Sequence, residues 1–126
     1  MNQKPARSLA RLLSAAVVLV LLAACASATP AAPAPLVVTL KAQDLMFDQM
    51  TLTAKVGQPV TINFQNVGAL EHSFVIDQLN VKLEHVQPGQ TATVTFTPSA
   101  AGSYTYYCDV PGHKEAGMKG ILTVSS

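Results

Sequence analysis

Between residues 36 and 126, short runs rich in Val, Thr, Ile, Phe and Tyr recur at regular intervals. Apolar and polar residues alternate most clearly over residues 60–66 and 91–97, as in strands that bury one face. Glycine and proline separate the runs, and no segment keeps a helical period over ten residues, although residues 78–86 are ambiguous. The further predicted strands cover residues 36–40, 52–56, 73–77, 103–107 and 120–124. The sequence therefore predicts an all-β fold, a two-sheet antiparallel β-sandwich with Greek-key connections.

The N-terminal segment has the layout of an export signal. Lys4, Arg7 and Arg11 precede an uncharged apolar run over residues 12–24. This run is shorter than the roughly 20 apolar residues that cross a bilayer, which disfavours a permanent transmembrane helix. We therefore predict a signal peptide over residues 1–24 and export from the cytoplasm.

The residues before Cys25 resemble a bacterial lipoprotein signal, in which two small residues precede a cysteine that is acylated and becomes the new N-terminus. The alternative is an ordinary signal with an incidental cysteine, because small residues also suit ordinary cleavage. The Ala/Pro-rich stretch over residues 25–35 predicts an extended tether. The resemblance implies a lipoprotein on the outer face of the cytoplasmic membrane or in the periplasm, with its folded domain over residues 36–126.

The composition of the predicted domain limits its functions. Residues 36–126 contain five lysines, no arginine and seven acidic residues, a formal net charge of −2, so they offer no basic stripe to nucleic acid. The domain is long enough for one core but not for an appended catalytic domain. The chain has two cysteines, so lipidation of Cys25 leaves Cys108 without a disulfide partner. That thiol requires another explanation.

The segment between the last two predicted strands carries three metal-binding residue types. Cys108, His113 and Met118 follow one another at five-residue intervals, with glycine and proline residues between them that permit turns. His72 stands immediately before the predicted strand over residues 73–77. Two imidazoles, one thiolate and one weakly bound thioether form the ligand set of a blue-copper centre. We therefore predict that these four residues bind one copper ion.

The mixed ligand set suits an ion that changes oxidation state. Cu(I) favours sulfur and Cu(II) favours imidazole nitrogen, so this set serves both states. Taken alone, His72 would be interpreted as a hydrogen-bonded histidine and Met118 as a core residue. Their joint occurrence with Cys108 and His113 in an exported all-β chain is what indicates copper.

The sequence resembles the cupredoxins, the family of plastocyanin and azurin, over residues 36–126 and most strongly over residues 104–124. Its four-residue spacers on both sides of His113 are most similar to those of auracyanin. The resemblance implies a Greek-key sandwich with one type 1 copper, held by the four residues above, in an electron carrier rather than an enzyme. It also implies a monomeric domain in which His113 reaches the surface. Redox donors and acceptors would dock there on an apolar patch formed by Pro111, Gly112, Ala116 and Met118.

Two positions depart from the common family pattern. Many cupredoxins have Asn after the first histidine ligand, where it links the two ligand segments, whereas this chain has the shorter Ser73. The residue after the cysteine is often Ser or Thr and is Asp109 here. A carboxylate near copper favours Cu(II) and lowers the reduction potential unless solvent screens it. The sequence leaves open whether Ser73 spans the gap.

Several other residues have structural interpretations. His85 lies in a charged segment with no sulfur neighbour and is interpreted as structural. Met46 and Met50 are interpreted as packing residues rather than a second Cu(I) site. Tyr104 and Tyr106 share one face of a predicted strand, which favours packing over a role as stations for electrons.

The predicted function is outer-sphere, one-electron transfer by a membrane-tethered type 1 copper protein, with His113 as the exit route. The alternative is an exported copper chaperone or storage protein, although such proteins usually use exposed Met or His clusters or paired cysteines. A copper nitrite reductase is disfavoured because only His85 remains for a second copper. A copper A subunit would need a second cysteine near Cys108.

Overall fold

The computed structural model describes residues 31–126. The predicted signal peptide, the predicted lipidation at Cys25 and the first part of the tether lie outside the described residues and stay predictions. Residues 31–35 have no regular secondary structure, and Gln58 Nε2 donates a hydrogen bond to the Ala34 carbonyl at 2.7 Å. Among the described residues, no helix has the length and apolar character needed to span a membrane.

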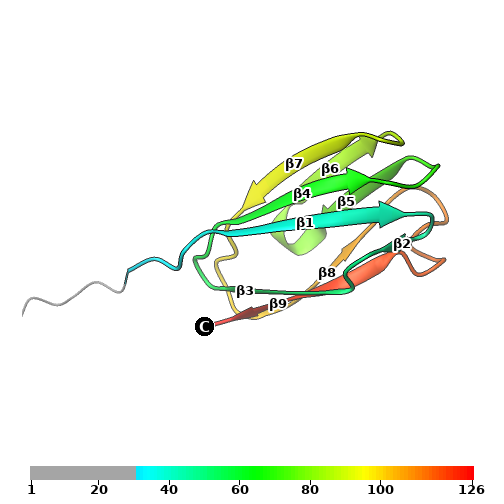
Figure 1. The fold of residues 1–126 in the computed structure, drawn as a ribbon. Helices are drawn as coiled ribbons and strands as arrows, with labels where there is room; N and C mark the ends of the chain where they lie inside the picture. The colour runs from blue at the N-terminus through cyan, green and yellow to red at the C-terminus, as the bar shows by residue number, and fades with distance from the viewer. Residues whose placement is uncertain (1–30) are drawn as a thin grey trace, which may run out of the picture.

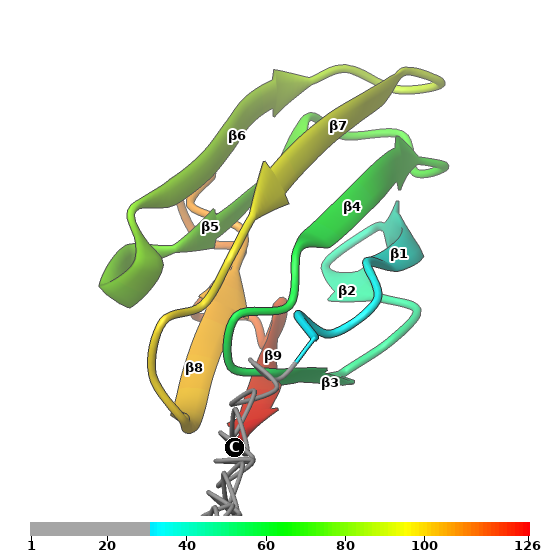
Figure 2. The same ribbon diagram turned by 90° about the vertical axis from the view of Figure 1, so that its left-hand side faces the viewer.

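The described residues form a sandwich of two β-sheets (Figures 1 and 2). Its elements are β1 (Leu36–Gln43), β2 (Met46–Phe47), β3 (Thr51–Lys55), β4 (Val60–Asn66), β5 (His72–Ile76), the 3₁₀ turn η1 (Asp77–Leu79), β6 (Val81–Val86), β7 (Thr91–Phe96), β8 (Gly102–Tyr107) and β9 (Lys119–Ser125). The four-stranded sheet has the order β2-β1-β4-β7, and the five-stranded sheet has the order β3-β9-β8-β5-β6. The predicted two-sheet, all-β sandwich is confirmed.

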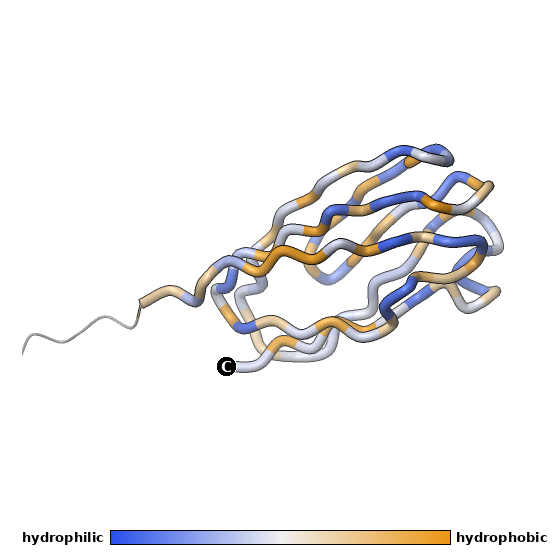
Figure 3. Tube along the Cα trace, in the orientation of Figure 1, coloured by the Kyte–Doolittle hydropathy of each residue, from blue (hydrophilic) through white to orange (hydrophobic). Residues whose placement is uncertain are grey.

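Strand β4 shows how the sequence pattern fixes the orientation of a strand. Val60, Ile62 and Phe64 are fully buried, while the residues between them are partly exposed. Figure 3 shows apolar and polar residues alternating in the same way along other strands. Full burial of a large apolar side chain contributes about 1.5–3 kcal/mol, so a slip of one residue would forfeit the contribution of the whole set.

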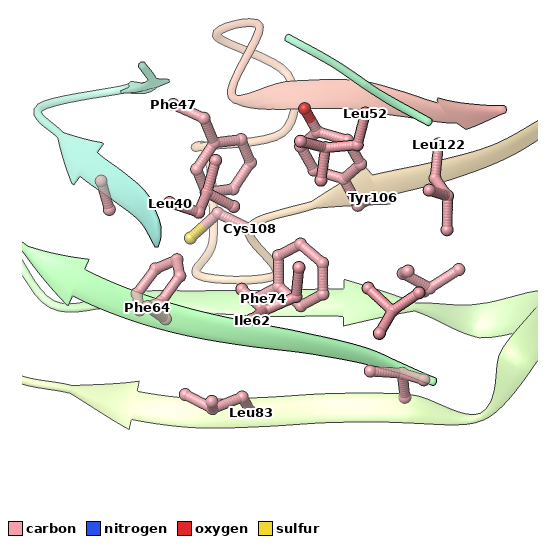
Figure 4. Close-up of a cluster of buried hydrophobic side chains, with 14 of the residues drawn as sticks. Leu40, Phe47, Leu52, Ile62, Phe64, Phe74, Leu83, Tyr106, Cys108 and Leu122 are labelled. Carbon is pink, nitrogen blue, oxygen red and sulfur yellow. The ribbon is translucent and has the colours of Figure 1, made fainter. Parts of the chain in front are cut away.

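The apolar faces of the two sheets meet in one core (Figure 4). Phe47 packs against Phe64 and Tyr106, with ring centroids 6.2 and 5.5 Å apart. Phe74 packs against Tyr106 at 5.5 Å. The Cys108 side chain belongs to the same buried cluster, and Figure 4 shows its sulfur among these core residues. The functional site is therefore continuous with the core.

Two strand pairs run parallel, β1 with β4 and β3 with β9, and the other pairs are antiparallel. The sequence pattern had predicted antiparallel pairing throughout. Alternation along a strand reports which face is buried, but side chains alternate in the same way in parallel and antiparallel pairs. Strand direction is set instead by the connections, because the chain leaves the first sheet after β2 and enters the second sheet with β3.

The ambiguous segment over residues 78–86 contains most of the 3₁₀ turn and then β6, an edge strand. The pairing of β5 with β6 shifts register, so that Glu84 and His85 both lie opposite Ser73. His85 adopts φ 58 at this bulge. A bulge inserts one extra residue into a strand and interrupts the alternation of its side chains. This interruption explains why the sequence did not show β6 as a strand.

Candidate metal centre

The proposed ligands come together at one end of the sandwich. His72 begins β5, Cys108 follows β8, and the loop that leads into β9 carries His113 and Met118. One side-chain donor atom each from His72, Cys108 and His113 lies within 4.8 Å of the other two. Cys108 Sγ is 3.9 Å from Nδ1 of His72 and 3.4 Å from Nδ1 of His113. The fold thus brings His72 and Cys108, which are 36 residues apart in the sequence, next to each other.

The loop over residues 108–118 is held by hydrogen bonds within itself. The His113 N–H donates to the Val110 carbonyl at 3.0 Å, and the Met118 N–H donates to the His113 carbonyl at 3.0 Å. The Cys108 N–H donates to the Met118 carbonyl at 3.1 Å and closes the loop. Gly117 adopts φ 103, a conformation that residues with a side chain rarely adopt. These turns bring the side chains of Cys108 and His113 together and bury that of Met118.

Burial separates His113 from the other three residues. His72, Cys108 and Met118 are fully buried, whereas His113 keeps 7% of its surface exposed. The exposed residues nearest to His113 in the loop are the uncharged Pro111, Gly112 and Ala116 and the charged Lys114 and Glu115. Met118 was expected in the apolar surface patch, and this expectation is wrong, because the loop folds its side chain inward. His113 is the ligand candidate with access to the surface.

The electrostatics of the cluster suit a cation-binding site. Burial lowers the pKa of His72, and repulsion from His113 lowers it further. The His72 ring therefore favours the neutral form, in which a ring nitrogen carries a lone pair for a metal. Among the described residues, no group hydrogen-bonds the buried Nε2 atom of His72. Packing rather than a hydrogen bond at Nε2 orients this ring.

Ser73 spans the gap that the sequence analysis left open. The Asp109 N–H donates to Ser73 Oγ at 2.8 Å, and the Ser73 N–H donates to Cys108 Sγ at 3.4 Å. The segment that carries His72 is therefore linked to the segment that carries Cys108. Burial by itself raises the pKa of Asp109, but hydrogen bonds from Ser73 and Lys82 outweigh that effect and lower it. Asp109 is therefore ionised at neutral pH.

Asn66 holds the chain segment that leads into His72, a role that was not predicted from the sequence. Its side chain is buried, and Nδ2 donates to the carbonyls of Leu70 and Val86 at 2.7 Å each. Its Oδ1 accepts a hydrogen bond from the Gly68 N–H at 3.0 Å. The two bonds from Nδ2 hold the segment before His72 against the end of β6, and the bond from Gly68 closes a turn after β4. An Asn two residues before a Gly at the end of a strand is a turn signal that could have indicated the bond to Gly68, but not the bond to Val86.

The other residues that the sequence analysis considered lie apart from the cluster. The ring of His85 is exposed and its Nδ1 lies 2.8 Å from Glu71 Oε1, in agreement with a structural role. Met46 and Met50 were expected to pack in gaps of the core, but they are 49% and 60% exposed. Tyr106 is fully buried, and its hydroxyl donates to the Gln49 carbonyl at 2.5 Å, as expected for a packing residue.

Comparison with known proteins identifies the family. A model of the Cupredoxin-like domain matches residues 14–124, most of the chain. The chain belongs to the cupredoxin family. Auracyanin-A of Chloroflexus aurantiacus is 31% identical to this cupredoxin, and the match covers 74% of this chain and 75% of that protein. Chloroplastic plastocyanin of Chlamydomonas reinhardtii is 36% identical, over 64% of this chain and 59% of that protein.

The solved structures agree with the sequence relatives. Dithionite-reduced auracyanin from Roseiflexus castenholzii superposes on this cupredoxin with a TM-score of 0.68 at 26% identity, covering 75% of this chain and 100% of that one. The predicted resemblance to cupredoxins, and to auracyanin in particular, is confirmed. His72, Cys108, His113 and Met118 form the cluster typical of a type 1 copper site. Kinship with auracyanin and plastocyanin also agrees with the expectation of a carrier rather than an enzyme.

Proposed function

We propose that this cupredoxin carries single electrons between two redox proteins while it is tethered to a membrane. The copper would be held by Nδ1 of His72 and His113, the thiolate of Cys108 and the thioether of Met118. Copper in this setting supplies a one-electron couple between Cu(I) and Cu(II). The observation that carries the proposal is the burial of three of these residues beside a His113 that retains 7% exposure.

The residues of the chain limit the reaction to electron transfer. The cluster is continuous with the apolar core, so water has little access to the donors. The backbone hydrogen bonds of the loop and the link through Ser73 hold the donors in place, which favours small rearrangement when the charge of the ion changes. An electron would enter and leave through the edge of the His113 ring, with no bond made to a substrate.

The surface around His113 fits a partner with an apolar contact area. Pro111 and Ala116 are exposed beside His113. Val67 and Leu70, in the β4–β5 connection at the same end of the sandwich (Figure 1), are 53% and 45% exposed. Exposed apolar residues gathered in one region mark contact sites. The redox donor and the redox acceptor would use this surface in turn.

The tether would restrict the partners to those at the membrane. Cys25 carries the lipid in this proposal, and residues 25–35 connect it to β1. A Pro-rich segment extends by about 3 Å per residue, which gives a reach of roughly 30 Å. The domain could then swing between an exported donor and acceptor without leaving the membrane surface. Replacement of Cys25 by Ala should release the protein into the soluble fraction of exported proteins; retention at the membrane would contradict the anchor.

The spectrum of the copper-loaded chain tests the electron-carrier proposal. Added Cu(II) should produce an intense blue absorption and a reversible one-electron voltammogram. Cys108→Ser should abolish the blue absorption, because the oxygen cannot replace the copper–thiolate bond. His85→Ala is the matched control and should keep it, since His85 is exposed and apart from the cluster. A colourless complex that gives its copper readily to an acceptor would instead indicate a chaperone or storage protein.

A further inference from the structure

We propose that Ser73, Asp109 and Lys82 form a charge-balanced clasp that joins the two ligand segments and adjusts the reduction potential of the centre from outside the ligand set. This proposal rests on the copper centre proposed above. It assigns a role to the two positions that depart from the common cupredoxin pattern, and it adds Lys82, a residue of the neighbouring strand β6.

Ser73 and Asp109 hydrogen-bond to each other in both directions. The Asp109 N–H donates to Ser73 Oγ at 2.8 Å, and Ser73 Oγ donates to Asp109 Oδ1 at 2.6 Å. The short serine side chain closes the link because the aspartate side chain reaches back to meet it. The two residues therefore act as a pair, and neither departure from the family pattern is independent of the other.

The Ser73 hydroxyl has two possible acceptors for its single proton. Ser73 Oγ lies 2.6 Å from Asp109 Oδ1 and 3.5 Å from Cys108 Sγ. A hydroxyl has one proton to donate, and the short bond to a carboxylate is the stronger one. The Ser73 hydroxyl therefore donates its proton to Asp109 and not to the Cys108 sulfur. The sulfur still accepts a hydrogen bond from the Ser73 N–H at 3.4 Å. The pair controls how many hydrogen bonds reach the thiolate, which is a determinant of metal-site potentials.

The negative charge of Asp109 is partly balanced by an ion pair with Lys82. Its Oδ2 lies 3.0 Å from Lys82 Nζ, and the same Nζ lies 2.5 Å from Glu84 Oε1. The Asp109 side chain is 31% exposed, so solvent screens it only in part. A negative charge beside the centre favours Cu(II), and the ammonium group of Lys82 offsets that effect. The two charges should therefore move the potential in opposite directions.

Voltammetry of single-charge variants of the full chain tests this balance. Asp109→Asn should raise the reduction potential, and Lys82→Met should lower it. We expect changes of up to about tenfold in the ratio of Cu(II) to Cu(I) affinity, where tenfold corresponds to about 59 mV for one electron. The Lys82→Met shift should shrink in the Asp109→Asn background. Added salt should reduce all of these shifts, because the groups are partly exposed.

Lys55→Met is the matched control for the loss of one lysine. Lys55 ends β3, at the opposite end of the sandwich from the β8–β9 loop (Figure 1), and should leave the potential nearly unchanged. The charge proposal fails if Asp109→Asn and Lys82→Met shift the potential in the same direction. It also fails if neither variant shifts the potential more than Lys55→Met does.

A second measurement needs no copper. In the metal-free chain, Ser73→Ala and Asp109→Ala should each lower stability and should be non-additive in a double-mutant cycle, because both remove the bond from Ser73 Oγ to Asp109 Oδ1. Ser73→Ala should have the larger effect, because it also removes the acceptor of the Asp109 N–H. Ser73→Ala should also speed alkylation of Cys108, whose sulfur loses a neighbouring group. Additive effects would overturn the clasp even if the copper centre is intact. If instead the wild-type chain forms no blue centre, the proposed function fails and the effect on the potential fails with it.

Discussion

The two sides of the metal centre are built in different ways. One side, the strand wall, consists of His72 and Ser73 at the start of β5. The other side, the loop wall, consists of residues 108–118 and contributes the other three proposed ligands. The loop wall is closed by its own short-range hydrogen bonds. The strand wall is held by groups far away in the sequence, among them Cys108, which is 35 residues from Ser73.

The two walls therefore depend on different parts of the chain. The turns of the loop wall depend on residues within the loop, such as Gly117 with its φ of 103. The position of the strand wall depends on the core beneath Phe74 and on the buried Asn66. Damage to the core should therefore displace His72, whereas damage to the loop turns should disturb the centre with a smaller loss of stability.

The largest effect is expected from Phe74→Ala, which removes the support of the strand wall. Phe74 is fully buried, and its ring lies 6.4 Å from that of Phe64 and 5.5 Å from that of Tyr106. We expect a loss of about 3–5 kcal/mol in the free energy of unfolding, because the deletion leaves a cavity. Urea denaturation of the metal-free chain measures this. Leu70→Ala, at an exposed site, should stay within about 0.5 kcal/mol, and a comparable loss there would contradict a special role for the core beneath the strand wall.

A smaller effect is expected from Asn66→Ala, which should loosen the strand wall alone. The change leaves the carbonyls of Leu70 and Val86 without their side-chain donor. We expect a loss of about 2–3 kcal/mol, because each buried group without a partner costs about 1–3 kcal/mol. In hydrogen exchange, the Ser73 amide should lose protection while the Met118 amide keeps it. Equal loss at both amides would show that the two walls are not independent.

Gly117→Ala tests the loop wall with a still smaller loss. The backbone at φ 103 is strained for alanine, and no heavy atom lies within 4 Å of the added Cβ, so strain is the main cost. We expect about 1–2 kcal/mol. Gly57→Ala is a matched control at φ 75 with similar open space, distant from the centre. Both should lower the urea midpoint, but only Gly117→Ala should alter the blue absorption; an unaltered spectrum would count against the role of the loop turns.

The smallest effect concerns the exposed pair of His85 and Glu71 beside the strand wall. The hydrogen bond to Glu71 raises the pKa of His85 above its ordinary 6.5, and that bond is also the main cause of the lowered pKa of Glu71. The stabilisation from protonated His85 is fully present below pH 6.5 and is lost as pH rises through the folded-state pKa. Glu71→Gln should bring the pKa of His85 back toward 6.5 in an NMR titration. An unchanged titration would show that the pair is not formed in solution.

Much of the fold could be read from alternation in the sequence. The predicted strand over residues 60–66 has the same bounds as β4, and the other predicted strands agree with observed ones within a few residues. Strand β6 was ambiguous because its bulge at His85 interrupts the alternation. The two-residue strand β2 is too short to show any period. The parallel pairs could not be predicted because alternation carries no information about strand direction.

The residues of the candidate site also differ in how far the sequence alone could predict them. Cys108, His113 and Met118 are recognisable in sequence because one loop carries all three with regular spacing. His72 was predicted from its residue type and its place before a strand, but only the folded sheets bring its donor atom within 4.8 Å of those of Cys108 and His113. Asn66 was missed, because its role lies in contacts that the fold creates.

The residue types of the cluster, the spacing of the loop and the faces that each strand buries follow from the sequence alone, because they depend on neighbours along the chain. The directions of the strands, the inward position of Met118 and the pairing of Asp109 with Ser73 and Lys82 became apparent only in the folded molecule. These features require segments tens of residues apart to meet. Contacts between such segments form only when the two sheets close over a shared core, and local patterns carry no record of which segments will become neighbours.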